Sequence, residues 1–416
     1  MADEDPDHLI EREREVRAAF SPSAPITRKA LFAGRIEQLI QLIEAVDEPG
    51  QHVVIYGERG VGKTSLATVC KEATGGGTSA IKINCQTNDT FSSTWRKAFN
   101  EFRIVSEAPG FGFSTETRQS IVTAADYFSG VDPLTPDHVR VGLTLLTRDT
   151  PATIFFDEFD RLEQSTHRLM ADTLKTLSDD VVPATVVIVG VADDVDELVS
   201  EHASIERALQ QISMPRMTRF ELAEIVTNGL DSVKMKIDSK ILTRLTGLSQ
   251  GLPHYTHLLA QQSAASAVWR SSDTIQDVDF SQGITKSLKK AQESTHQMYY
   301  QATFSPRENL YKQVLLACAA ARVDDRGYFS ASAVREPLSL IMGRAYDIPQ
   351  FALHLNQLSS ERGPVLKKEG TQKKFRYRFL NPLMQPFVLM RGLTDELITV
   401  KMLEQLEEDK PVPAVS

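Results

Sequence analysis

The sequence has few cysteines, no excess of positive charge and no long hydrophobic run. Its 416 residues include three cysteines (Cys70, Cys85 and Cys318), too few and too scattered to predict a disulfide framework or a zinc site. The longest uncharged apolar block, 314–321, is much shorter than a membrane span. The net charge of −9 argues against general nucleic-acid binding but leaves room for a local basic patch. With an acidic start that lacks a signal-like apolar segment, the sequence predicts a cytoplasmic protein.

The most informative stretch, 53–66, joins an apolar run to a glycine-rich loop and a helix-like segment. Gly57 is followed, after four residues, by Gly62, Lys63 and Thr64, which is the pattern of a phosphate-binding P-loop. Its glycines let backbone N–H groups approach an anion, and the N-terminus of the next helix adds further donors. We expect Lys63 to contact the β- and γ-phosphates of ATP and Thr64 to bind Mg²⁺. The other loop residues expected to bind the nucleotide are Glu58, Arg59, Gly60, Val61 and Ser65.

A second motif lies about a hundred residues further on. The apolar run 153–156 ends in Asp157 and Glu158, as a Walker B strand does. We expect Asp157 to hold Mg²⁺ through its water shell, and Glu158 to orient and polarise the attacking water. A strand that merely ends in a polar cap is the alternative, but the position after a P-loop favours catalysis.

Almost continuously apolar strands alternate with helical patterns through this half of the chain. Strands are expected at 53–57, 79–85, 153–157 and 184–191, and such runs are typical of a parallel sheet covered on both faces. Right-handed crossovers bring the carboxyl ends of parallel strands to one edge. The predicted fold class is therefore α/β, a P-loop parallel sheet, which brings Lys63, Asp157 and Asp193 together.

The C-terminal part predicts a winged helix with a basic wing. Helical patterns at 309–321, 330–334 and 348–358 precede an alternating hairpin at 365–379. Residues 361–391 hold eight basic and two acidic residues, so their balance is +6 against −9 for the chain. No arginine or lysine occurs between Ile348 and Ser360, the candidate recognition helix, which argues against sequence-specific reading of DNA. The residues that we expect to contact DNA phosphates are Lys367, Lys368, Lys373, Lys374, Arg376 and Arg378.

Together these features resemble the AAA+ ATPases of the Orc1/Cdc6-like group and, more broadly, their STAND relatives. The resemblance rests on the Phe32–Arg35 box, the P-loop, the Asp157–Leu162 motif and three further segments. These are Val189–Asp194 at the place of sensor 1, Ser204–Arg207 followed by Ile212–Pro215 around the arginine finger, and Gly251–His254 at the start of the sensor 2 helix. It implies that Phe32, Arg35, Pro253 and His254 contact the nucleotide and that Asp193 acts as sensor 1. It also implies that Arg207 acts as a finger on a neighbouring subunit, with Arg216 and Arg219 as alternatives.

Two departures from that family bear on the rate of hydrolysis. Asp193 stands where the family has Asn, Ser or Thr, and His254 replaces the sensor 2 arginine in a Gly-Leu-Pro setting closer to STAND proteins. Both leave nucleotide binding intact and favour slow turnover. His254 and His257 lie one helical turn apart without a suitably spaced third ligand, so we expect packing or adenine contact rather than a metal site.

Five segments follow from these observations. We expect an acidic N-terminal arm (1–24), a P-loop ATPase core (25–215), a helical lid with a connector (216–300), a winged helix (301–391) and a C-terminal helix with a tail (392–416). The leading hypothesis is an ATPase with Mg²⁺ as cofactor, which forms an oligomer or hetero-complex and engages double-stranded DNA or a protein. The alternatives are a STAND-like signalling switch and a nucleotide-stabilised scaffold for an effector protein, neither directed to DNA.

Overall fold

The computed structural model describes residues 6–22, 34–74, 78–108, 118–193, 195–199, 205–306, 309–324, 326–371 and 374–408. Of the predicted site residues, Phe32 and Lys373 lie outside these ranges. In the described ranges, no helix combines the length and apolar character that crossing a membrane requires.

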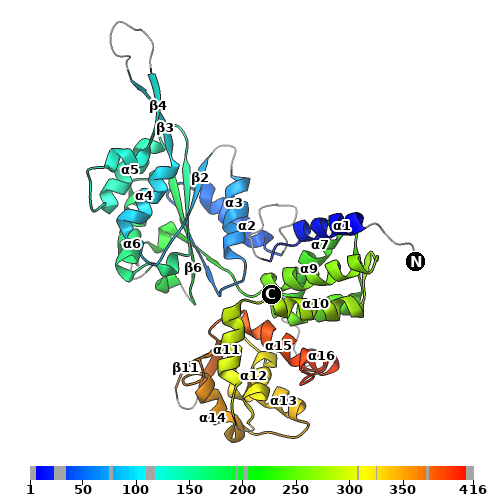
Figure 1. The fold of residues 1–416 in the computed structure, drawn as a ribbon. Coiled ribbons are helices and arrows are strands. Elements are labelled where there is room, and N and C mark those ends of the chain that lie inside the picture. Colours follow the sequence, from blue (N-terminus) through cyan, green and yellow to red (C-terminus); the bar gives the residue numbers. More distant parts are fainter. Residues whose placement is uncertain are drawn as a thin grey trace.

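The N-terminal half is built on a parallel five-stranded sheet of order β2-β5-β6-β1-β7 (Figure 1). Four strands occur where the apolar runs predict them, and the short β7 is an addition. The strands are β1 (His52–Gly57), β2 (Ser79–Asn84), β5 (Ala152–Asp157), β6 (Ala184–Val191) and β7 (Leu209–Ser213). The predicted α/β class is therefore confirmed.

Alternate residues of the central strands enter two separate hydrophobic cores, because successive side chains of a strand point to opposite faces. Val54, Ile154 and Phe156 pack in one core and Val53, Ile55 and Phe155 in the other. The first core includes residues of α4 (Phe91–Glu101), α5 (Pro136–Leu146) and α6 (Gln164–Asp179). The second includes residues of α2 (Ile36–Asp47) and α3 (Lys63–Ala73).

The stretch 103–134 contains an antiparallel hairpin. Strands β3 (Arg103–Ala108) and β4 (Arg118–Thr123) pair along their length and project from the sheet domain (Figure 1). A short 3-10 helix, Ala124–Phe128, then returns the chain to the core.

The next part is a helical lid that also contains the N-terminal helix. Its helices are α7 (Arg219–Ser232), α8 (Ser239–Leu248), α9 (Pro253–Trp269) and α10 (Asp277–Lys290), with short strands β8 (Lys236–Ile237) and β9 (Thr274–Ile275). Helix α1 (Pro6–Ala19) packs on α7 and α9, and Val16 and Phe20 are fully buried there. The segment expected as an acidic N-terminal arm contains this helix, and the end of the helix packs in the lid.

Within the described residues, the C-terminal part has six helices and a three-stranded antiparallel sheet of order β10-β12-β11, which agrees with the predicted winged helix. The elements are α11 (Glu293–Thr303), α12 (Tyr311–Ala320), β10 (Phe329–Ser330), α13 (Ala331–Met342), α14 (Ile348–Leu358), β11 (Leu366–Glu369), β12 (Arg376–Phe379), α15 (Met384–Thr394) and α16 (Val400–Glu408).

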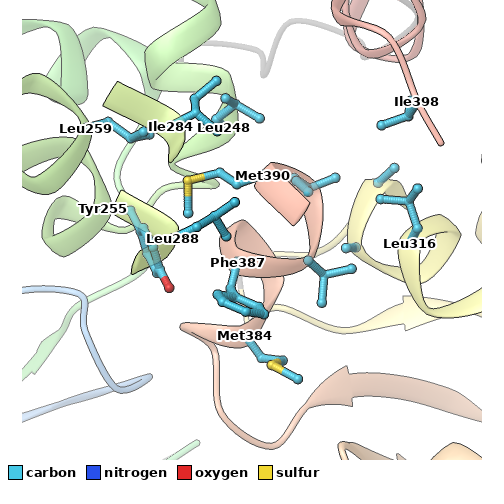
Figure 2. Packing of buried hydrophobic residues seen from close by; sticks show 14 of the residues in the cluster. Leu248, Tyr255, Leu259, Ile284, Leu288, Leu316, Met384, Phe387, Met390 and Ile398 are labelled. Atoms are coloured by element: carbon cyan, nitrogen blue, oxygen red, sulfur yellow. The ribbon is translucent and has the colours of Figure 1, made fainter. Parts of the chain in front are cut away.

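Lid and winged helix share one hydrophobic core, in which α15 occupies the middle (Figure 2). Phe387 and Met390 of α15 lie between Leu288 of the lid and Leu316 of α12 in this view. The same continuous cluster reaches from Phe20 to Leu406. The two parts therefore pack as one body, although the sequence suggests separate segments.

Candidate nucleotide site

The P-loop links the end of β1 to the start of α3 through three glycines with positive φ. Gly57, Gly60 and Gly62 have φ of 144°, 90° and 99°, a region that side chains disfavour. Gly57 also has no room for a larger residue, since a Cβ there would lie 2.4 Å from the Met214 carbonyl oxygen. Lys63 Nζ donates to the carbonyl oxygens of Gly57 and Glu58, at 2.8 Å each, so the lysine curls over the loop.

Thr64 and Asp157 meet at the carboxyl edge of the sheet. Thr64 Oγ1 donates to Asp157 Oδ1 at 3.2 Å, and the backbone N–H of Glu158 donates to the same oxygen at 3.0 Å. The side chain of Glu158 is half-exposed and pairs with Arg161 at 3.1 Å. Asp157 also has a partner that the sequence did not indicate, because Lys82 Nζ lies 2.9 Å from its Oδ2.

These groups open into a pocket of about 410 Å³ between the sheet, the lid and the end of α1. Its walls combine residues of the P-loop and the end of β5 with residues of the lid. The lining residues are Ser21, Pro22, Arg35, Arg59, Gly60, Gly62, Lys63, Thr64, Ser65, Asp157, Glu158, Asp160, Arg161, Gly190, Val191, Met217, Ile225, Pro253, His254 and His257. The size suits a nucleotide, since ligand pockets typically measure about 300–1,000 Å³.

The ammonium group of Lys63 is held in a largely buried position among carboxylates. Burial lowers the pKa of Lys63 to about 8, while Asp160, Asp157 and Glu58 act in the opposite direction. Asp160 is fixed in turn because its Oδ1 accepts the backbone N–H of Val191 at 2.8 Å. A polyanion at the P-loop would favour the charged form of this lysine.

The opposite wall of the pocket is formed by the lid and the residues after α1. His254 Nδ1 lies 2.7 Å from the Pro22 carbonyl oxygen, and burial lowers the pKa of this histidine. His257 is fully buried against Phe20 and has no hydrogen-bond partner among the described residues, and burial lowers its pKa to about 4. Both imidazoles are therefore neutral at physiological pH. Among the described residues, no cluster of three or more His, Cys, Asp or Glu side chains forms a metal site.

Glu58 of the P-loop takes part in a buried ion pair that reaches the C-terminal part. Arg216 donates to both carboxylate oxygens of Glu58, at 2.7 and 3.0 Å, and both side chains are only 8% exposed. The same guanidinium donates to Gln385 Oε1 at 2.7 Å and to the Gln250 carbonyl oxygen at 3.2 Å. Arg216 is thus committed within the chain, which argues against its alternative role as an arginine finger.

Asp193, the expected sensor 1 residue, is held by the wing. Arg378 donates to Asp193 Oδ1, Tyr328 Oη donates to Oδ2 at 3.3 Å, and Lys367 Nζ lies 3.7 Å from the same oxygen. Leu383 also packs against the P-loop, since a Cβ on Gly60 would lie 3.3 Å from its Cδ2. The winged helix therefore contacts the ATPase core at two places.

Two other wing residues predicted to bind DNA, Lys368 and Arg376, are also engaged within the chain. Lys368 donates to Asn356 Oδ1 at 2.7 Å and lies over the Phe375 ring. Arg376 pairs with Glu369 at 3.2 Å and lies over the Tyr328 ring. Lys374 is exposed. Several of these basic groups therefore neutralise carboxylates of the same chain.

Two further predicted residues, Arg35 and Arg207, lie in different parts of the sheet domain. Arg35 is buried in the pocket wall, donates to the Pro215 carbonyl oxygen and lies 3.7 Å from Glu221, so it joins α2 to the lid. Arg207 is exposed before β7, at the amino end of the strands, whereas the P-loop lies at the carboxyl end. Of the described residues that line the pocket, none is Arg207, so it lies away from the pocket of its own chain.

Comparison with known proteins agrees with this geometry. Residues 32–189 match the family described as AAA ATPase domain. None of the curated proteins is significantly similar to the chain.

Among solved structures, a Walker-type ATPase of Pyrococcus abyssi is 17% identical, with a TM-score of 0.52 and coverage of 88% of this chain and 98% of that one. Cdc6p from Pyrobaculum aerophilum is 16% identical, with a TM-score of 0.45 and coverage of 92% and 99%. The Orc1 protein of Aeropyrum pernix, solved in complex with DNA, is 14% identical, with a TM-score of 0.47 and coverage of 92% and 98%. At such identities a structural likeness concerns the fold. Residues 32–189 therefore match an AAA ATPase domain in sequence, and the chain has the fold of a P-loop ATPase.

Proposed function

We propose that this chain binds ATP with Mg²⁺ in the pocket between P-loop and lid and hydrolyses it slowly. The nucleotide state is then passed to the winged helix and, through it, controls oligomerisation and the engagement of DNA or a protein. The observation that carries the proposal is the meeting of Lys63, Thr64 and Asp157 at one end of a pocket whose other end is apolar.

The donor set at Thr64 and Asp157 suits Mg²⁺, which prefers hard oxygen ligands and takes the rest from water and phosphates. Mg²⁺ bound there would neutralise charge on the β- and γ-phosphates. Lys63 would turn from the loop carbonyls to the same phosphates. Glu158 would orient the attacking water, which requires its side chain to leave Arg161.

Slow turnover follows from what the site residues already contact. Asp193 is held by the wing, and His254, which replaces the sensor 2 arginine, is bound to Pro22 and supplies no positive charge. A finger supplied by a neighbour raises the rate of such enzymes by about 10³–10⁵-fold. If Arg207 has this role, the rate per subunit depends on association.

The test is the ATPase rate per subunit against protein concentration, with and without double-stranded DNA, at two salt concentrations. We expect the protein to bind a fluorescent ATP analogue, and we expect Lys63→Ala to abolish this binding. We also expect the ATPase rate per subunit to rise with protein concentration in the parent protein but not in Arg207→Ala. Arg219→Ala tests the alternative finger in the same way, because Arg219 is also exposed but lies on the lid. A rate independent of concentration in the parent protein would refute the oligomer-dependent mechanism.

A second candidate is a STAND-like switch that does not use DNA, and the wing contacts favour it. Lys367 and Arg378 hold Asp193, so DNA phosphates would have to displace a carboxylate to reach them. Reversing the charge of Lys373 and Lys374 separates the two candidates. DNA affinity and its salt dependence should fall if the wing binds phosphates. If the affinity for DNA did not change, or if the parent protein did not bind DNA, the STAND-like switch would be the remaining candidate.

A nucleotide-stabilised scaffold is distinguished by Glu158→Gln. This change should leave ATP binding intact and abolish hydrolysis. A scaffold would keep its biological output in that variant, whereas an ATPase cycle would lose it.

A further inference from the structure

Lys82 contacts the metal-site carboxylate on the side away from the P-loop. Asp157 Oδ1 accepts from Thr64 and from the Glu158 backbone, while Oδ2 lies 2.9 Å from the ammonium of Lys82. The side chain of Asp157 is 5% exposed and that of Lys82 is 17% exposed, so water screens this pair only partly. Each oxygen of Asp157 therefore has a partner.

The position of Lys82 explains how it reaches this carboxylate. Strand β2 runs parallel to β5, and Lys82 lies opposite Phe155, two residues before the level of Asp157. Its Nζ also lies 3.5 Å from Thr68 Oγ1, and that hydroxyl donates to the Thr64 carbonyl oxygen at 2.7 Å. The ammonium thus connects β5 to α3, the elements that carry Asp157 and Thr64.

Lys82 acts on the pocket through Asp157 rather than by direct contact. Of the described residues, Asp157 belongs to the pocket lining and Lys82 does not. Lys63 already provides the cation that faces the phosphates. A second lysine behind the carboxylate instead changes how much negative charge Asp157 presents to the pocket.

We infer that Lys82 is a positioning residue and a fixed counter-charge for Asp157, which makes nucleotide binding nearly independent of Mg²⁺. The inference rests on the proposed ATP site. The ammonium of Lys82 repels a dication bound at Asp157, so the binding free energy of Mg²⁺ at this carboxylate is less favourable. When no metal is bound, the phosphates of the nucleotide face a carboxylate whose charge Lys82 already neutralises. Asp157 therefore repels them less, and the nucleotide loses less binding free energy. Both effects reduce the thermodynamic coupling between Mg²⁺ and nucleotide.

The experiment measures the dissociation constant of a fluorescent ATP analogue in excess Mg²⁺ and in excess EDTA. The readout is the ratio of the two constants, which does not depend on catalysis. We expect a ratio below about tenfold in the parent, and a rise of about tenfold or more in Lys82→Met and Lys82→Gln, equivalent to about 1.4 kcal/mol of coupling. Lys82→Arg keeps the charge and should keep the parent ratio.

Lys71→Met is the matched control for loss of a lysine, because Lys71 lies on α3 about 12 Å along the helix from Lys63. Lys82→Gln retains an amide donor toward Asp157 if Lys82→Met does not fold. A parent ratio above about a thousandfold would overturn the inference without any variant. So would an equal loss of affinity with and without Mg²⁺ in the variants, which is the mark of a purely structural lysine. A parent that binds no nucleotide in either condition would instead refute the proposed function, and the inference with it.

Discussion

Removing Arg216 should destabilise the protein more than removing any exposed arginine, because it leaves a buried carboxylate in the P-loop. Glu58 and Arg216 are each 8% exposed, and Arg216 also serves Gln385 and the Gln250 carbonyl. Breaking a buried pair by deleting one partner costs about 3–5 kcal/mol. Gln385 keeps its own hydrogen bonds to Ala319 and Gln250 when Arg216 is removed, so we expect a cost at the lower end of this energy range. We expect Arg216→Met to lower the free energy of unfolding by about 3 kcal/mol.

A double-mutant cycle isolates the ion pair from the other losses. Replacing both partners by neutral side chains of similar size removes the uncompensated charge, so Arg216→Met combined with Glu58→Gln should cost less than the two single changes together. We expect a coupling energy of about 2 kcal/mol. The assay is urea unfolding followed by far-ultraviolet circular dichroism without nucleotide, since the pair lies beside the phosphate site.

Arg161→Met provides the control, because the Arg161–Glu158 pair is 46% and 48% exposed. Exposed pairs contribute about 0–1 kcal/mol. If Arg216→Met cost no more than this control, or if the cycle were additive, the pair would not join the P-loop to the C-terminal part as described.

Three other changes test the site. Burial lowers the pKa of Lys63 to about 8 from the ordinary 10.5, so between these pH values the unfolded chain binds more protons and stability rises with pH. Lys63→Met should therefore stabilise the nucleotide-free protein by about 1–3 kcal/mol near pH 7 and by progressively less toward pH 10.5. Thermal unfolding measured across this pH range tests the expectation, and a destabilised variant at neutral pH would contradict it. Glu158→Gln should lower the ATPase rate about 10²-fold or more while the affinity for ATP changes less than about threefold, and a matching loss of affinity would mean that Glu158 binds rather than catalyses. Asp193→Ala leaves Arg378 without its carboxylate and should speed limited proteolysis around the wing, whereas Asp196→Ala, an exposed neighbour, should not.

The parts of the site that follow from local pattern were predictable from the sequence. Lys63, Thr64 and Asp157 belong to motifs in which an apolar run fixes the strand and the next residues fix the chemistry. The parallel sheet then brings the two motifs to one edge. The short β7 has no comparable signal, because only Ile212 of its five residues is buried.

The contacts between distant segments could not be predicted in this way. Glu58 and Arg216 are 158 positions apart, and Asp193 and Arg378 are 185 apart. Each looks like an ordinary surface charge until the tertiary fold supplies its partner. The same holds for Lys82, an isolated lysine in a strand. The burial of Phe20 depends on Gly229, where a Cβ would lie 2.4 Å from the ring, and neither residue reveals the other in sequence.

The position of α15 has a mechanical consequence. A helix whose two sides are embedded in neighbouring bundles cannot slide without opening the common core, so a rotation of the lid must carry the wing with it. The segment before α7 meets the lid at Gly251, where the backbone N–H of Met217 donates to the Gly251 carbonyl oxygen at 2.9 Å. Because Arg378 of the wing also holds Asp193 of the sheet domain, such a rotation would have to move or break that contact. Motion of the lid would thus reach the wing through side-chain packing rather than through the chain connection between them.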